Sequence, residues 1–315
     1  MKSYIKKALA FTLMSFIITS CGSDSKSDGT TLSGVVKVDG SSTVFPITEA
    51  VAEEFGKKYP KVRVTVGISG TGGGFKKFCS GEIDINDASR TIKEKEVKKA
   101  KENNIEYIEL PVAYDGLSVV INKDNDFIDY LTVKELNAIW KYGSSMKKWS
   151  DVRANWPKKD IKLYGPGTDS GTFDYFKEAI IGKKNNIRSD FTKSEDDNVL
   201  VTGIAGSKYA LGFFGYAYYA ENKDKLKVVK IDGGGGPVAP TEKTINDGSY
   251  SPLSRPIFIY VNPVSTQMKQ VDEFVNFYLL NAKNLVLEVG YVPLPDDLQE
   301  KTLFRYQNKI TGKWF

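Results

Sequence analysis

The chain has 315 residues, with 44 Lys and Arg against 39 Asp and Glu, a formal net charge of +5, and no histidine. The lack of histidine excludes His-based catalytic triads and His-containing zinc sites. In the most basic stretch, 93–101, acidic residues alternate with the lysines, as on a solvated helix face. We therefore expect neither a metal ion nor a nucleic-acid partner.

The N-terminus predicts export. Three lysines lie within residues 1–7, and the apolar stretch that follows, 8–18, is too short for a permanent membrane span. This pattern is typical of a secretory signal peptide. The run Ile18-Thr19-Ser20-Cys21 resembles the lipobox of bacterial lipoproteins, and this resemblance implies cleavage before Cys21 and its diacylation. The alternative is an ordinary signal peptide with an incidental cysteine. Residues 22–33 are polar and predict a tether.

Removal of residues 1–20 takes away three lysines and no acid, so the net charge falls from +5 to +2. With Cys21 acylated, Cys79 is the remaining cysteine, and no intrachain disulfide can form. We expect Cys79 to be a small buried hydrophobic residue.

One local plan occurs four times along the chain: a strand-like run, a turn of small polar residues and a helix-like run. Alternating strands and helices predict an α/β fold with a largely parallel sheet, whose ligands bind where strands end and helices begin. The four turns are therefore candidates for one shared site. The expected strands are 35–40, 61–66, 82–87 and 160–167, and the helices that follow them are 46–59, 75–81, one from Thr91 and 173–182.

Two further apolar strands, 111–125 and 251–263, are each followed by a predicted helix, 132–143 and 265–290. No linker rich in Pro, Gly or Ser divides the chain into sequential domains, so two lobes would have to be discontinuous. We expect lobe I to comprise 34–112 and 257–315, and lobe II to comprise 113–256.

The glycine-rich run 67-GISGTGGGF-75 does not match the nucleotide-binding motifs. A P-loop requires Gly-Lys followed by Ser or Thr, and none of the Gly-Lys pairs has that residue. A dinucleotide fingerprint starting at Gly70 would need glycine where Phe75 stands. A serine-hydrolase elbow would need a closing glycine and a histidine base. These absences favour a binding protein without a cofactor over an enzyme.

Hydroxyls and backbone N–H groups at helix starts can bind a small oxyanion. Each turn alone is better explained by helix capping than by ligand binding, but these turns carry three or more polar groups where a cap needs one. Arg90 adds a cation at a predicted helix start, where positive charge opposes the helix dipole unless an anion lies in front of it. The alternative for Arg90 is an ion pair with Glu94.

Two carboxylates, Asp87 at the end of an expected strand and Asp169 in the fourth turn, are also close to the proposed anion. Phosphate keeps a proton near neutral pH and sulfate keeps none, so a carboxylate acceptor in the site would favour phosphate. Either aspartate could instead cap its own helix.

Long segments of the sequence resemble the periplasmic phosphate-binding proteins of phosphate ABC importers, the PstS family. They are GSSTVFP at 40–46, GISGTGGGFKKFCSGEIDINDASR at 67–90, YGPGTDSGTFDYF at 164–176, KYALGFFGYAYY at 208–219 and PLSRPIFIYV at 252–261. The resemblance implies a type II periplasmic-binding-protein fold, with two α/β lobes of mixed, mostly parallel sheets joined by a hinge. It also implies a monomeric, non-enzymatic lipoprotein that binds inorganic phosphate and works with a membrane-embedded ABC permease.

The resemblance implies phosphate-binding residues in both lobes: Ser41, Ser42, Thr43, Ser69, Gly70, Thr71, Asp87, Ser89, Arg90, Ser170, Gly171 and Thr172. Many family members carry an arginine shortly before their Ser-Gly-Thr turn, where this chain has Gly165-Pro166-Gly167. We expect Arg90 to supply that charge. Many also carry an aspartate where Ser89 stands, so the acceptor of the ligand proton is either Asp87 or a serine oxygen. The alternative functions are binding of sulfate, molybdate or tungstate, and hydrolysis of phosphate esters.

Overall fold

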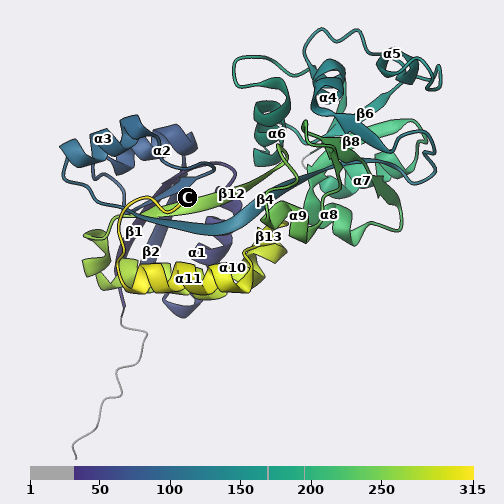
Figure 1. Cartoon of the computed structure of the whole chain (residues 1–315). Helices are drawn as coiled ribbons and strands as arrows, with labels where there is room; N and C mark the ends of the chain where they lie inside the picture. The colour runs from purple at the N-terminus through teal and green to yellow at the C-terminus, as the bar shows by residue number, and fades with distance from the viewer. Residues whose placement is uncertain (1–31, 169, 195) are drawn as a thin grey trace, which may run out of the picture.

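The computed structural model describes residues 32–168, 170–194 and 196–315. The predicted signal peptide, the predicted lipidation site Cys21, most of the predicted tether and Asp169 lie outside the described residues. Figure 1 shows two lobes side by side, joined by the long strands β4 (Ile108–Asn122) and β12 (Ser254–Val261).

Lobe I has one half of a long mixed sheet, with helices on both of its faces. Its strand order is β2-β1-β3-β12-β4, with β1 parallel to both of its neighbours. In Figure 1, α2 and α3 lie above this sheet, whereas α10 and α11 lie below it. The bounds of these elements are β1 (Gly34–Gly40), α1 (Phe45–Lys58), β2 (Val62–Ile68), α2 (Gly70–Phe78), β3 (Ile85–Ala88), α3 (Glu94–Glu102), the 3-10 helix η3 (Ser265–Gln267), α10 (Lys269–Glu288) and α11 (Asp296–Gln307).

Lobe II continues the sheet in the order β4-β8-β6-β7, with β9 and β13 also paired to β4, and adds a small sheet, β11-β10-β5. Its strands are β5 (Tyr130–Thr132), β6 (Lys162–Gly165), β7 (Thr192–Lys193), β8 (Ala210–Gly215), β9 (Leu226–Val228), β10 (Lys230–Asp232), β11 (Pro237–Val238) and β13 (Val292–Pro293). Its helices are α4 (Val133–Trp140), α5 (Trp149–Val152), α6 (Gly171–Phe176), the π-helix η2 (Lys177–Ile181), α7 (Asp197–Ala205), α8 (Tyr216–Glu221) and α9 (Glu242–Asn246).

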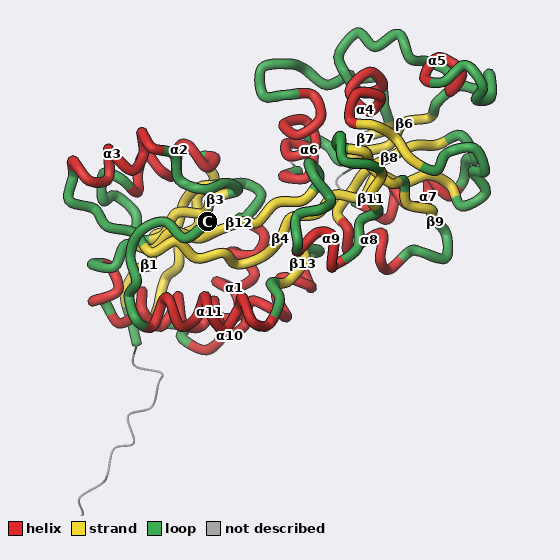
Figure 2. The backbone as a smooth tube through the Cα atoms, viewed as in Figure 1, coloured by secondary structure: helices red, strands yellow, loops and turns green. Residues whose placement is uncertain are grey.

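The two joining strands carry the chain between separate hydrophobic cores. Figure 2 shows β4 and β12 running side by side from one lobe to the other, and they pair antiparallel. On β4, Ala113 packs in the core of lobe I and Tyr114 in the core of lobe II. On β12, Ile257 packs in the core of lobe I, and Leu253, just before β12, packs in the core of lobe II. The lobe boundaries expected from the sequence fall on these strands and remain a prediction, although Val292 of β13, expected in lobe I, packs in the core of lobe II.

Most expected elements form, with three differences. Helix α2 begins inside the glycine-rich run, at Gly70, earlier than expected. The expected start of a helix at Thr91 is wrong, because α3 begins at Glu94: the Glu96 carboxylate accepts the backbone N–H of Lys93 and so caps the later start. The sheet is also more antiparallel than expected, because β12 and β4 pair antiparallel with their neighbours in both lobes.

Cys79 is buried against Phe75 and Phe78, as expected, and burial raises the pKa of its thiol to about 11. Among the described residues, no helix is long and apolar enough to cross a membrane.

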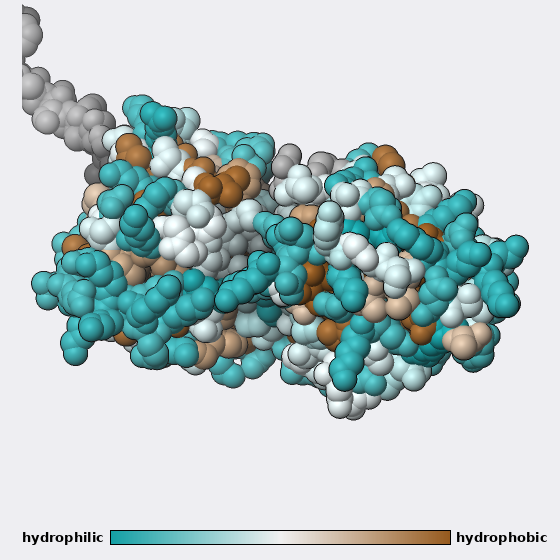
Figure 3. Space-filling view, turned by 90° about the horizontal axis from the view of Figure 1, so that it is seen from above, coloured by the Kyte–Doolittle hydropathy of each residue, from teal (hydrophilic) through white to brown (hydrophobic). Residues whose placement is uncertain are grey.

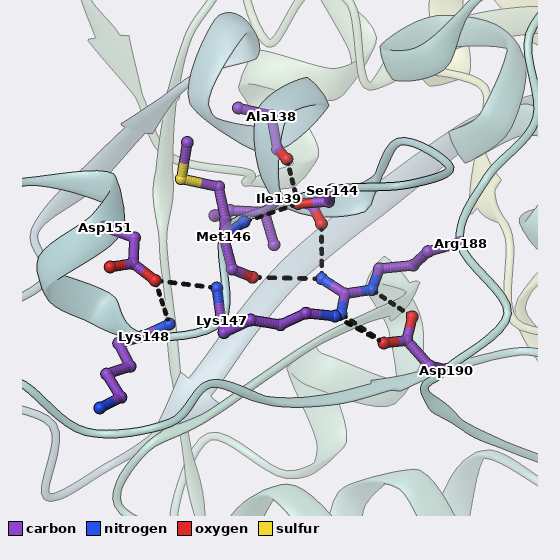
Figure 4. Close-up of polar contacts among 9 residues, drawn as sticks. All are labelled: Ala138, Ile139, Ser144, Met146, Lys147, Lys148, Asp151, Arg188 and Asp190. Atoms are coloured by element: carbon purple, nitrogen blue, oxygen red, sulfur yellow. Dashed lines mark hydrogen bonds and ion pairs between the residues drawn. The ribbon is translucent and has the colours of Figure 1, made fainter.

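Two loops of lobe II are fixed together by one buried arginine. Figure 4 shows that Arg188 forms a two-pronged ion pair with Asp190 and donates to the carbonyl oxygens of Ile139 and Met146. The backbone N–H of Tyr142 donates to the Asn186 carbonyl at 2.9 Å. The segment that contains residues 182–190 is therefore held against the loop that follows α4.

Candidate functional site

A cleft of about 660 Å³ opens between the lobes, lined by α2 and the start of α3 on one side and by α6 and η2 on the other. Figure 1 places α2, α3 and α6 on the same side of the molecule, and Figure 3, seen from that side, shows hydrophilic side chains on both sides of the junction. A second, smaller cavity of about 340 Å³ adjoins it, and Ser42 lines both.

The first predicted turn, Ser41–Thr43, connects β1 to α1 and lies in the cleft wall. Its shape is set by the N–H of Ser41 donating to the Asp87 carbonyl at 3.0 Å and the N–H of Thr43 donating to the Ser41 hydroxyl at 3.2 Å. Gly40 has a φ of +142°, and a Cβ there would lie 2.2 Å from the Asp87 carbonyl oxygen. The close approach of β3 therefore requires glycine before the hydroxyl turn.

The second and third predicted turns meet at the start of α2. The hydroxyls of Thr71 and Ser89 lie 3.1 Å apart, and the N–H of Ser89 donates to Thr71 Oγ1 at 3.1 Å. Thr71, Ser89 and Gly70 all line the cleft. Ser69 does not line it, because its N–H and hydroxyl both donate to Asp39, at 3.0 and 2.5 Å.

Two later glycines of the run, Gly73 and Gly74, provide clearance, whereas Gly72 has room for a Cβ. A Cβ on Gly74 would lie 1.9 Å from Asn86 Oδ1 and 2.7 Å from Gly40 Cα, and one on Gly73 would lie 2.8 Å from Ser69 Oγ. These glycines let α2 pack directly on the ends of β1 and β3.

The fourth turn, Ser170–Thr172, lines the smaller cavity together with Ser42 and Asp115. The Ser170 hydroxyl accepts the N–H of Thr172 at 3.2 Å, so it also acts as a helix cap. A Cβ on Gly171 would lie 2.9 Å from Thr43 Cα. The turn from lobe II therefore contacts the turn from lobe I at Gly171. Any other residue at this position would displace the backbone.

An ion pair between Arg255 and Asp115, which the sequence analysis missed, lies where these turns meet. Arg255 on β12 is the direct cross-strand partner of Asp115 on β4. Its Nε and Nη2 lie 3.4 and 3.3 Å from Asp115 Oδ2, and Nη2 also lies 3.3 Å from Thr43 Oγ1. The guanidinium stacks 3.7 Å above the ring of Tyr175. The available signal in the sequence was a charged residue within each of two apolar strands.

Both members of this pair have limited contact with water, with 16% of the Arg255 side chain and 4% of the Asp115 side chain exposed. Burial raises the pKa of Asp115 to about 6, although the Arg255 charge opposes the rise. The pair thus places a fixed cation and a proton-accepting carboxylate among hydroxyls from both lobes.

Arg90 lines the cleft but already has a carboxylate partner. Its two terminal nitrogens bind Glu96 at 2.9 and 2.8 Å, and its guanidinium lies 5.3 Å from the centre of the Phe75 ring. The ion pair weighed in the sequence analysis was with Glu94, and the observed partner is Glu96, because α3 begins later than expected. Much of the Arg90 charge is therefore balanced within lobe I.

Asp87 lies beneath the cleft and does not line it. Its carboxylate accepts the Thr48 hydroxyl at 3.0 Å, and Thr48 in turn lies 3.2 Å from the Tyr278 hydroxyl. Burial raises the pKa of Asp87 to about 8. Two acceptors of the ligand proton were considered from the sequence. Ser89 lies in the cleft wall with the other predicted residues, whereas the Asp87 carboxylate bonds to Thr48 and does not line the cleft.

In the described part of the chain, no group of three or more His, Cys, Asp and Glu side chains is arranged to hold a metal ion. The polar groups of the cleft are hydroxyls, amides, cations and single carboxylates, which are the donors and acceptors of an oxyanion site.

Comparison with known proteins identifies the family. A family model described as a PBP superfamily domain matches residues 25–282. The phosphate-binding protein PstS of Staphylococcus aureus strain USA300 is 41% identical over 299 residues, which cover 94% of this chain and 89% of that protein. The chain belongs to the PstS family. The SphX protein of Synechococcus elongatus is also similar to this PstS-family chain, with 49% identity over 284 residues, 89% of this chain and 84% of the relative.

A crystal structure described as a possible phosphate binding protein from Planctomyces limnophilus matches this PstS-family fold. The TM-score is 0.85 at 51% identity, and the match covers 89% of this chain and 99% of that one. The two-lobed type II periplasmic-binding-protein fold expected from the sequence is thereby confirmed.

Proposed function

We propose that this protein binds inorganic phosphate between its two lobes. The observation that carries the proposal is the meeting of Thr43, Gly171 and the Arg255–Asp115 pair, which brings donors from both lobes to one point. A ligand that bonds to both lobes stabilises the closed arrangement, because only that arrangement makes both sets of contacts.

The proposed ligand contacts are hydroxyls and N–H groups that the sequence predicted, together with one new cation. Arg255 replaces Arg90 as the principal positive charge in this proposal, because Arg90 is engaged by Glu96. We leave out Ser69 and Asp87, whose side chains bond elsewhere. The proposed set is Ser41, Ser42, Thr43, Gly70, Thr71, Ser89, Ser170, Gly171, Thr172 and Arg255, with Arg90 at the wall.

Asp115 takes the role of proton acceptor in this proposal. It is buried, it lines the same cavity as Ser42 and the Ser170–Thr172 turn, and only one of its oxygens bonds to Arg255. A carboxylate at this place accepts the proton of phosphate and repels sulfate, which has none. This selectivity favours phosphate over the alternative of a sulfate, molybdate or tungstate receptor.

The proposal describes a receptor and not an enzyme. The relatives from Staphylococcus are phosphate-binding proteins named PstS. The cleft supplies hydrogen-bond donors without the base that would activate a serine, since the chain has no histidine. Phosphate would be released unchanged to an ABC permease.

Export and anchoring belong to the same proposal. The lipobox-like run ending at Cys21 supports a lipoprotein that faces the periplasm or the cell exterior, with residues 22–33 as its tether. Growth of expressing cells with labelled palmitate should label the wild-type protein and leave Cys21→Ser unlabelled. Equal labelling of both proteins would contradict the anchor.

Calorimetric titration tests the ligand. Phosphate should bind one to one and sulfate at least tenfold more weakly, and Asp115→Asn should narrow that difference because its amide no longer repels sulfate. Equal affinity of the wild-type protein for the two anions would overturn the assignment of phosphate.

A further inference from the structure

The outer walls of the cleft hold a concentration of positive charge beyond the hydroxyl turns. Eight Lys and Arg residues line the cleft against three acids, an excess of five cations. The whole chain without residues 1–20 carries a net charge of +2, its +5 less three lysines. The rest of that chain therefore carries a net charge of +2 − 5 = −3, and the positive charge is concentrated at the cleft.

Four of these lysines form no salt bridge within 4.0 Å among the described residues, although the charges of Glu96 and Asp174 act on Lys93 and Lys177. They are Lys76 on α2, Lys93 and Lys95 at the start of α3, and Lys177 on η2 of the opposite lobe. Lys183, in contrast, pairs with Glu178 at 2.7 Å. The first three are exposed and Lys177 is half-buried. Their charge is thus available to an anion that enters the cleft.

Cations face one another across the opening. The positive charge of Arg90, followed by desolvation and the charge of Lys183, lowers the pKa of Lys93, although Lys183 belongs to the other lobe. Lys183 lies on the segment that Arg188 holds against the loop after α4 (Figure 4). Like charges on opposing walls resist closure, and an anion between them removes that resistance.

We propose that Lys76, Lys93, Lys95 and Lys177 form a cationic vestibule, an outer site that attracts multiply charged oxyanions into the cleft and opposes closure of the lobes until one is present. The inference rests on the proposed function and deepens it. The vestibule selects anions by their charge, and the inner hydroxyls and Asp115 then select anions that carry a proton. Focused charge in a cleft raises association rates by about 10- to 1,000-fold. The vestibule therefore favours the dianion of phosphate over its monoanion.

Salt concentration separates this outer site from the inner contacts. The Debye length is about 30 Å at 0.01 M salt and about 3 Å at 1 M, so the vestibule acts over its full depth at low salt and is screened at high salt. Direct hydrogen bonds in the inner site keep most of their strength under both conditions.

The test compares two variants that lose the same charge. K76Q/K93Q/K95Q/K177Q removes the vestibule, and the control K61Q/K123Q/K134Q/K158Q removes four exposed lysines that line neither cavity and pair with no described carboxylate. Calorimetric titration with inorganic phosphate is run on the full mature chain at about 10 mM and about 500 mM salt. Thermal unfolding of each variant verifies that the surface changes leave the fold intact.

We expect the vestibule variant to bind phosphate about tenfold more weakly than wild type at low salt, and within twofold of it at high salt. The control should stay within twofold of wild type at both salts. An equal loss of phosphate affinity in both variants would assign the effect to total charge and contradict the outer site. Wild-type affinity of the vestibule variant at low salt would also refute the outer site. Failure of the wild-type protein to bind phosphate at either salt would instead refute the proposed function.

Discussion

Replacement of Arg255 by glutamine separates the role of this residue in binding from its role in stability. The substitution removes the guanidinium that lies 3.3 Å from Thr43 Oγ1 and leaves Asp115 buried without its partner. Loss of a charge-assisted hydrogen bond to the ligand costs about 1.5–3 kcal/mol. Since about 1.4 kcal/mol corresponds to a factor of ten, the Kd for phosphate should rise roughly 10- to 150-fold.

The stability cost of the same change can be removed independently. Breaking a buried ion pair costs about 3–5 kcal/mol, and uptake of a proton by Asp115 reduces that cost, because its pKa of about 6 rises further without Arg255. The double variant Arg255→Gln with Asp115→Asn has no unpaired charge. It should recover most of the thermal stability lost in the single variant.

Calorimetry and thermal unfolding of both variants provide the assay. The double variant should unfold close to wild type and still bind phosphate at least tenfold more weakly. Wild-type affinity in the stable double variant would refute the placement of the Arg255–Asp115 pair in the binding site.

Two further predictions concern groups beneath the cleft. The pKa of Asp87 is about 8 in the fold and about 4 when unfolded, so the unfolded state loses its proton first, and the free energy of unfolding should fall as the pH rises from about 4 to about 8. Between pH 5 and pH 8 the melting temperature of the wild type should therefore fall relative to that of Asp87→Asn. The same change of melting temperature in both proteins would contradict a raised pKa of Asp87. Gly74→Ala should destabilise the protein by about 1–3 kcal/mol because its Cβ meets Asn86 and Gly40, whereas the matched change Gly56→Ala, in open space on α1, should stabilise it slightly. Denaturant unfolding measures both, and equal stability of the two variants would refute the packing explanation.

The sequence predicted the architecture because its signals are local. Polar turns between strand-like and helix-like runs were readable at Ser41–Thr43, at Gly70–Thr71 and at Ser170–Thr172, and these turns line the two cavities. Gly73 and Gly74 leave no room for a side chain, so the glycine-rich run serves the close approach of α2 and not a nucleotide.

The residues that sequence reasoning misplaced depend on strand phase and on long-range pairing. Successive residues of a strand face opposite sides, so a one-residue uncertainty in β3 decides whether Asp87 reaches the cleft or the Thr48 hydroxyl below it. Arg255 and Asp115 are 140 positions apart and meet only through the antiparallel register of β12 with β4. No local sequence pattern indicates which residues of β12 and β4 lie opposite each other.

A crystal structure of the protein grown with phosphate tests the central claim most directly. We predict one phosphate between the lobes, within hydrogen-bond distance of Thr43, of the Ser170–Thr172 turn and of Arg255. Phosphate bound elsewhere, or held by one lobe alone with Arg255 still bound only to Asp115, would contradict the account.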